Sequence, residues 1–385
     1  MAGALAARTL ARPSFETAFA APAFGRAMLD FESALARALA EEGLIPQASA
    51  AAIGAACKAL LVDEAKLVAE GKSSATLAVP LVEMLRAEIA KSSKDAAQHA
   101  HFGATSQDVL DTAMALCLRT CLEEADRSLE GAVRGLAAKA REHAATPMIG
   151  RTLMQPALPI TAGFKIGGWA LALAHDRERL GEAQQAGLAV QLGGPVGMLE
   201  SMGGKGQAVR HRVAMRLGLA DVPAWHVHRN AWIDLLDRIG QVVATAGKIA
   251  LDIALMQQPE VGEMLEAAPR AGVGASSSMP HKRNPVGCVH ALAAATRMPG
   301  LLATVHTAAI AQHERALGGW QAELAVVPDI AAQLGSALDF LDGIAQSLVV
   351  DAKRMKANLD THAGSAGAVP AHAADEVLAA LSPYL

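Results

Sequence analysis

The sequence predicts an all-α protein built around long helices, and three observations support this prediction. Apolar residues make up 52% of the 385-residue chain, whereas aromatic residues make up only 3%. Much of the apolar content is alanine, the best helix former, whose small side chain lets helices pack closely. Prolines are absent between positions 80 and 147, 159 and 195, and 223 and 259. These features favour packed helices over sandwiches or barrels.

The N-terminal stretch 1–12 carries two arginines and no acidic residue. It lacks the apolar core and the cleavage pattern of a targeting segment, so we expect a disordered lead-in. An amphipathic helix is then predicted over 26–42, ending at Gly43.

A second helix is predicted to open at Pro46 and to continue to position 68. A loop of small residues over 71–78 separates it from a third helix over 80–90. Together these pieces predict a small helical N-terminal domain, residues 1–107.

The proline-free stretch 223–259 carries apolar residues at helical spacing. These residues are Ile233, Leu236, Ile239, Val243, Ile249, Ile253 and Met256. A helix of about 30 residues would run about 45 Å, and a similar helix is expected over 301–326. Helices this long hide their apolar faces in a bundle, which we expect to be shared between subunits. The prediction is a central bundle domain, 108–345, and a short C-terminal segment, 346–385.

Composition also excludes several classes of function. A net charge of −4 argues against a nucleic-acid partner. No uninterrupted apolar run is long enough to span a bilayer, so no membrane partner is expected. The four cysteines show no Cys-x-x-Cys spacing, and Cys117 and Cys121 share a helix face, which predicts buried thiols in a reducing cytoplasm.

A loop without helical or strand period lies at 272–285 and reads Gly-Val-Gly-Ala-Ser-Ser-Ser-Met-Pro-His-Lys-Arg-Asn-Pro. We call it the signature loop. Its glycines let the backbone come close to a ligand, Lys282 supplies a point charge, and Asn284 and the serines supply donors. Such a loop suits closure over a small polycarboxylate, although an average loop of this composition would be a solvated turn.

The signature loop resembles that of the fumarase/aspartase superfamily, in which the pattern Ser-Ser-x-Met-Pro-x-Lys-x-Asn-Pro is long and specific. The matching residues are Ser276, Ser277, Met279, Pro280, Lys282, Asn284 and Pro285. Ala275 stands where the family usually has glycine, which would stiffen the hinge of the loop. The resemblance implies a homotetramer in which three subunits contribute to each active site.

Two further segments resemble the other site regions of this superfamily. Residues 101–108, His-Phe-Gly-Ala-Thr-Ser-Gln-Asp, precede a helical run over 109–122. Thr and Ser at a helix start are also ordinary caps. The resemblance implies that Thr105 and Ser106 hold a substrate carboxylate and that His101 contacts the substrate.

The third region, residues 150–159, contains Gln155, which the resemblance implies holds a carboxylate. Superfamily lyases that release an amine have a His at the position of Leu153, paired with a Glu at the position of Val289. That pair protonates a poor leaving group, whereas a carboxylate is already stable as an anion and needs no such acid. Because this chain lacks both the His and the Glu, the sequence favours a reaction in which a carboxylate forms a carbon–oxygen bond.

Segments 27–36, 223–229 and 319–323 resemble one branch of the superfamily, the bacterial cycloisomerases of 3-carboxy-cis,cis-muconate, and the likeness spans 24–358. It implies lactonisation of a small tricarboxylate in protocatechuate degradation, the β-ketoadipate pathway, without cofactor or metal. By this resemblance Ser276 carries the proton, with Ser277 as the alternative if the register differs by one.

Alternatives remain open at this point. One is a fumarate-releasing lyase of the same superfamily, similar to adenylosuccinate lyase, and another is a non-catalytic structural homologue. The pairs His99/His101 and His226/His228 have the spacing of metal ligands, but no further ligand motif accompanies them, so no metal site is expected. Without a Gly-x-Gly-x-x-Gly motif, no dinucleotide site is expected either.

Overall fold

The computed structural model describes residues 2–267, 274, 279, 282–362, 369 and 372–385, and the predicted all-α class is confirmed. The helices are α1 (Ala2–Arg8), α2 (Pro13–Ala18), α3 (Ala21–Glu41), α4 (Gln47–Ala59), α5 (Glu64–Ser74), α6 (Ala78–Ala90), α7 (Lys94–Gln98), α8 (Ser106–Glu142), α9 (Ala162–Gly187), α10 (Gly206–Leu217), α11 (Asn230–Met256), α12 (Val286–Ala308), α13 (Gly319–Ser347), α14 (Ala352–His362) and α15 (Asp375–Leu381). Two antiparallel ribbons pair β1 (Pro147–Thr152) with β2 (Gln155–Thr161) and β3 (Met264–Glu266) with β4 (Leu348–Val350).

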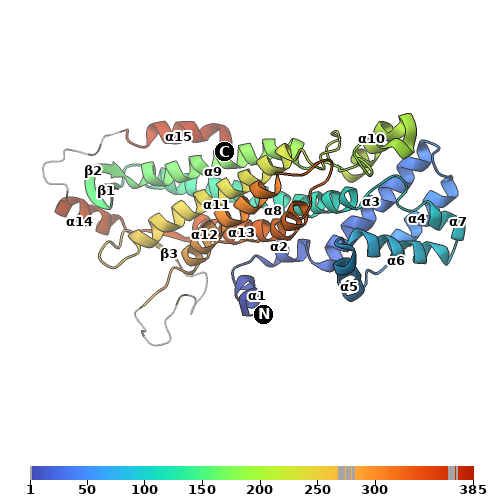
Figure 1. Cartoon of the computed structure of the whole chain (residues 1–385). Coiled ribbons are helices and arrows are strands. Elements are labelled where there is room, and N and C mark those ends of the chain that lie inside the picture. The colour runs from blue at the N-terminus through green and yellow to red at the C-terminus, as the bar shows by residue number, and fades with distance from the viewer. Residues whose placement is uncertain (1, 268–273, 275–278, 280–281, 363–368, 370–371) are drawn as a thin grey trace.

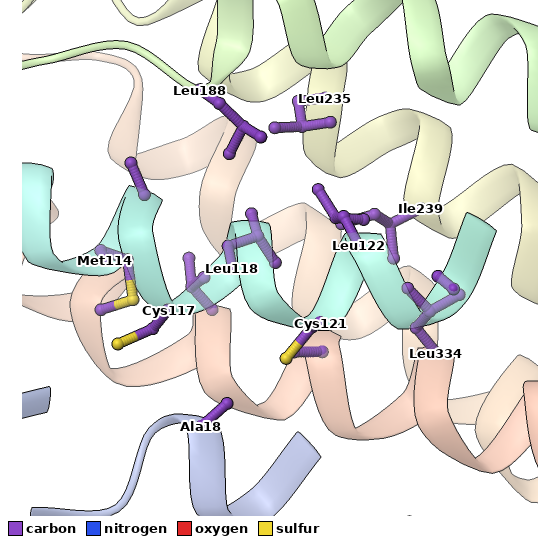
Figure 2. Close-up of a cluster of buried hydrophobic side chains, with 14 of the residues drawn as sticks. Ala18, Met114, Cys117, Leu118, Cys121, Leu122, Leu188, Leu235, Ile239 and Leu334 are labelled. Atoms are coloured by element: carbon purple, nitrogen blue, oxygen red, sulfur yellow. The ribbon is translucent and has the colours of Figure 1, made fainter. Parts of the chain in front are cut away.

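An elongated bundle of α8, α9, α11, α12 and α13 forms the body of the molecule (Figure 1). Its helices are held by a continuous apolar core. Figure 2 shows one layer of that core, where side chains from α8 meet Leu235 and Ile239 of α11 and Leu334 of α13. Cys117 and Cys121 lie in this layer, so their predicted burial is confirmed.

The two ends of the bundle differ. Helices α3 to α7 gather at the end where α8 begins, and α10 packs against α3 although it lies far away in the sequence (Figure 1). The β1–β2 ribbon and α14 lie at the opposite end, where α8 finishes. The division into three domains stays a prediction.

The N-terminal expectation was wrong. Residues 2–8 form α1, and Arg12 is buried instead of belonging to a disordered lead-in. The Arg12 guanidinium donates to Asp339 over 2.6 Å, to Asp342 over 2.7 Å and to Glu124 over 2.9 Å. This charge-assisted set fastens the N-terminus to α8 and α13.

Two predicted helices are interrupted. The helix expected from 46 to 68 is divided into α4 and α5, because Asp63 caps a new helix by accepting from the Lys66 N–H over 3.0 Å. The helix expected over 301–326 stops at Ala308 and restarts at Gly319 after a turn in which Gly318 adopts a φ of 87°. That positive φ suits glycine and cannot continue a helix.

Contrary to the sequence expectation, three helices in the described part of the chain, α11, α12 and α13, are long and apolar enough by length and composition to cross a membrane. In α11 and α13 most of the apolar window is buried inside the fold, 56% and 67% respectively. In α12 only 22% of the window is buried. Leu292, Leu301 and Leu302 nevertheless pack partly against the core, whereas Val289 is exposed.

Candidate active site

The second region forms the turn that starts α8. Thr105 is the N-cap residue, with an extended backbone, and its N–H donates to Asp108 Oδ2 over 2.9 Å. Ser106 is the first helical residue, and both hydroxyl side chains are half-buried. A helix N-terminus presents unpaired N–H groups and a positive dipole end, so this turn is suited to bind an anion.

Asp108 organises the backbone behind that turn. It is fully buried and accepts from the N–H groups of Thr105, Gly193 and Gly194, all at about 3 Å. His226 Nε2 lies 2.7 Å from Asp108 Oδ1. One carboxylate therefore fixes the turn at the start of α8, a glycine loop and a histidine relative to one another.

A buried ionic cluster lies one helical turn further along α8. Arg229 Nη1 donates to Asp111 Oδ2 over 2.8 Å, and Arg229 Nε donates to Glu323 Oε2 over 2.8 Å. The indole N–H groups of Trp320 and Trp232 donate to Asp111 and Glu323. The segments ending at Arg229 and Glu323 resemble one branch of the superfamily, and the structure shows that their charged residues pack beneath the start of α8.

Burial sets the protonation of this cluster. Burial disfavours the charged form of Arg229 and so lowers its pKa. The combined attraction of Asp111 and Glu323 is larger, and the net effect is a raised pKa of the guanidinium. Burial raises the pKa of Glu323, and the attraction of Arg229 only partly offsets this. The guanidinium stays charged, and its partners lie deep in the fold.

Arg315 is a candidate site residue that the sequence does not reveal. It lies in the turn between α12 and α13, and its Nη1 donates to Thr105 Oγ1 over 2.9 Å. Its Nη2 donates to the Pro195 carbonyl over 2.8 Å. A positive charge is thereby fixed beside a residue expected to hold a carboxylate. No local motif marks Arg315, because 210 positions separate it from Thr105.

His101 lies on the loop just before Thr105, with its Nδ1 2.6 Å from Glu32 Oε1 on α3. Glu32 was not singled out from the sequence, although the segment 27–36 was. His101, Thr105 and Ser106 thus lie on one stretch of chain at the start of α8, contacted by Glu32 and Arg315.

The third region forms the β1–β2 ribbon. Leu153 and Met154 make its two-residue turn with φ values of 51° and 65°. Such a turn normally favours Asn-Gly, because both central residues need positive φ. Leu153 is 96% exposed and Met154 68% exposed, and Gln155 beside them is also exposed. The ribbon tip thus points away from the core of its own chain.

The described part of the signature loop presents Lys282 and Asn284 as exposed side chains. The Asn284 N–H donates to the Gly274 carbonyl over 2.8 Å, which brings the two ends of the loop together. Gly274 has a φ of 75°, and a Cβ there would lie 2.5 Å from the Asn284 carbonyl oxygen, so glycine is required. The expected proton carrier Ser276, its alternative Ser277 and Ala275 lie outside the described residues.

The helix after the loop is capped by Glu266 from β3. Its carboxylate accepts from the N–H groups of Gly287 over 2.9 Å and Cys288 over 3.0 Å. A carboxylate at a helix N-terminus is stabilised by the helix dipole. Because β3 is paired with β4, this cap fixes the point where the loop joins the bundle.

One chain does not bring the three regions together. Thr105 lies where α8 begins, whereas Gln155 lies beyond the other end of this 37-residue helix (Figure 1). At 1.5 Å per residue, α8 alone spans about 55 Å. β3 and the start of α12 lie toward the ribbon end. Thr105 and Gln155 of the same chain therefore cannot hold one small substrate.

Fold and site together define a helical lyase of the fumarase/aspartase type. A model of the lyase family matches residues 8–300, and the chain belongs to this family. A 3-carboxy-cis,cis-muconate cycloisomerase of Bradyrhizobium diazoefficiens is 45% identical over 337 residues, covering 87% of this chain and 74% of that protein. The cycloisomerase of the same name from Pseudomonas putida is 41% identical over 377 residues, covering 95% and 88%.

A solved structure agrees with these relatives. The crystal structure of 3-carboxy-cis,cis-muconate lactonizing enzyme from Pseudomonas putida superposes with a TM-score of 0.86 at 36% identity. The match covers 98% of this chain and 86% of that one.

Proposed function

We propose that this protein is a 3-carboxy-cis,cis-muconate cycloisomerase, an enzyme of the isomerase class that forms 4-carboxymuconolactone. The observation that carries the proposal is the high identity to cycloisomerases along most of the chain. The chemistry agrees with this proposal. Leu153, at an exposed turn, stands where amine-releasing lyases have their His, and Val289, exposed on α12, stands where they have its Glu partner. Neither side chain can donate a proton.

The reaction needs anion stabilisation rather than a strong acid. One substrate carboxylate adds across the conjugated double bond, a carbon–oxygen bond forms, and the electron pair moves to the carbon beside a second carboxylate. Lys282 and Asn284 stabilise that developing charge as preorganised donors. Thr105, Ser106 and Gln155 hold carboxylates, and His101 contacts the substrate.

The carbanion is then protonated by Ser276, or by Ser277 in the alternative register. Three carboxylates become two carboxylates and an ester, so each turnover consumes one proton from the solvent at neutral pH. The hydroxyl must be reprotonated from water to complete the cycle. No step uses a cofactor or a metal ion.

The decisive test follows the ultraviolet absorbance of 3-carboxy-cis,cis-muconate with purified protein and a chelator. We expect loss of the diene absorbance together with uptake of one proton per molecule in a pH-stat. Ser276→Ala should keep substrate binding and lose lactonisation. Activity near wild type in Ser276→Ala would transfer the role to Ser277 or refute it.

We further propose a homotetramer with active sites shared between subunits. The separation of Thr105 from Gln155 along α8 supports this, as do the exposed ribbon tip and the low buried share of α12 in the single chain. We place the enzyme in the cytoplasm, in protocatechuate degradation, with no nucleic-acid or membrane partner. Burial of four free thiols is compatible with a reducing compartment.

The alternatives have less support. A fumarate-releasing lyase would need an acid for its leaving group, and release of fumarate from adenylosuccinate would reveal it. A non-catalytic homologue is disfavoured by retention of Lys282 and Asn284, and turnover of the muconate would exclude it.

A further inference from the structure

Glu32 is a buried carboxylate that forms a hydrogen bond with His101. Glu32 is 1% exposed, and its Oε1 lies 2.6 Å from His101 Nδ1. Among the described residues, its other oxygen, Oε2, has no hydrogen-bond partner. A buried negative charge is costly unless it is paired, so the imidazole ring is the group that compensates it.

His101 is held in an unusual conformation that keeps this pair together. Its φ of 63° lies in the left-handed region, which is uncommon for residues other than glycine. The loop is fixed by the Ala104 N–H, which donates to the His101 carbonyl over 3.3 Å, and by Gly103, whose φ of 74° favours glycine. Strain of this kind persists where the surrounding structure enforces it, often at functional sites.

The ring has one nitrogen left for a ligand. Nδ1 of His101 is hydrogen-bonded to Glu32, whereas Nε2 forms no hydrogen bond with the described residues. The His101 side chain is 16% exposed. Thr105 and Ser106 follow four and five positions later. Nε2 is therefore available beside the turn that receives a substrate carboxylate.

The charges around the ring come from three other elements. Glu32 lies on α3, Asp108 on α8 and Arg86 on α6, where Arg86 Nη2 also donates to the Ala100 carbonyl over 3.1 Å. Burial lowers the pKa of His101 and Arg86 lowers it further, but Glu32 and Asp108 outweigh them, so the pKa is raised above its ordinary value.

We propose that Glu32 is a positioning residue that keeps His101 protonated, so that its Nε2–H is a charged donor to a substrate carboxylate. The assignment rests on the proposed function for the identity of that substrate. For a substrate with three carboxylates, an imidazolium supplies a positive charge in addition to those of Lys282 and of Arg315, whose Nη1 donates to Thr105.

The pair predicts a pH dependence with a definite sign. A raised pKa keeps the imidazolium populated at neutral pH, and the charge is lost as the pH rises through the pKa of His101. Substrate binding should weaken on this alkaline side while the chemical step persists.

The central experiment compares Glu32→Gln with Asp30→Asn, a matched carboxylate-to-amide change at an exposed site on the same helix. Glu32→Gln should raise KM about 10- to 100-fold at pH 7.5, the loss of a charged hydrogen bond, with kcat within about threefold. The alkaline limb of kcat/KM should move to lower pH. Asp30→Asn should match wild type. A fall in kcat with unchanged KM and an unmoved pH profile would overturn the proposal.

Two further variants separate a specific role from general damage. Because Glu32 acts through His101, Glu32→Gln should cause no additional loss in a His101→Gln background, and a full additive loss would contradict the pair. Arg86→Gln removes a positive charge near the ring and should move the alkaline limb to higher pH, opposite to Glu32→Gln.

A measurement without turnover distinguishes failure of the pair from failure of the proposed function. The His101 resonance of protein labelled with ¹³C at histidine Cε1 should titrate at lower pH in Glu32→Gln, and propane-1,2,3-tricarboxylate should bind wild type more tightly at pH 6 than at pH 9. If these results appear without muconate turnover, the cycloisomerase proposal fails and the pair stands. An unchanged His101 titration would refute the pair whatever the activity.

Discussion

At the residue scale, the Arg229 cluster determines how much of the site is fixed before any substrate arrives. One guanidinium holds two buried carboxylates, and two indoles satisfy further carboxylate lone pairs. Pairs of this kind are costly to break, because removing one partner leaves a buried charge unpaired. The cluster therefore acts as a rigid base under the start of α8.

We predict that Arg229→Met lowers the free energy of unfolding by about 3–5 kcal/mol, because Asp111 and Glu323 lose their cation. The control is Arg238→Met, which removes an exposed pair with Asp234 and should cost less than about 1 kcal/mol. Urea unfolding followed by circular dichroism measures both. Equal losses of unfolding free energy in the two variants would show that the buried cluster stabilises the fold no more than the exposed pair does.

The thiols give a second prediction at this scale. Burial raises the pKa of Cys57, Cys117 and Cys121 to about 12, and burial also raises that of Cys288. Because the thiolate is the reactive form, the native protein should not react with a disulfide reagent at pH 8. All four thiols should react in guanidinium chloride. Rapid reaction of the folded protein would mean that a thiol is exposed in solution.

At the element scale, the first turn of α8 depends on a single carboxylate. We predict that Asp108→Asn costs about 2–4 kcal/mol of stability, because an amide cannot accept from so many donors as a carboxylate. It should also raise KM, since Thr105 and the Gly193 loop are no longer fixed. Asp126→Asn on the same helix, where Asp126 forms an exposed pair with Arg177, is the control and should cost less than about 1 kcal/mol.

The long elements could be predicted from the sequence, because apolar spacing and missing prolines depend on local residues. The interruptions could not be predicted as well. The helix restart at Asp63 needs a capping bond, and the break before Gly319 accompanies the turn in which Arg315 reaches Thr105. The Asp63 cap joins positions only three apart but does not alter the apolar spacing, and the Arg315 contact joins positions 210 apart, so a periodic pattern reveals neither.

The site divides in the same way. Thr105, Ser106, Lys282 and Asn284 stand in contiguous motifs, so the sequence alone makes them candidate site residues. Glu32 and Arg315 reach the site from α3 and from the turn after α12, and only the fold brings them there. The segments containing Glu32, Arg229 and Glu323 resemble one branch of the superfamily, but the sequence does not show which groups their charged side chains contact.

At the scale of the whole molecule, shared sites predict complementation. Thr105→Ala and Lys282→Ala should each be nearly inactive alone. Refolded together in equal amounts, they should regain about a quarter of wild-type activity, since a site that takes each residue from a different chain is intact in one arrangement of four. The same variants folded separately and then mixed form the control. No recovery after joint refolding would place both residues of a working site on one chain.

The length of α8 also bears on when activity appears after synthesis of the chain. With active sites shared between subunits, as proposed above, a newly synthesised chain can complete its helices and its core and still hold only parts of several active sites. Enzyme activity would then appear after a delay set by encounters between chains, and the delay would shorten as their concentration rises. A cell beginning to produce this protein would degrade its substrate slowly at first, although every chain had already folded.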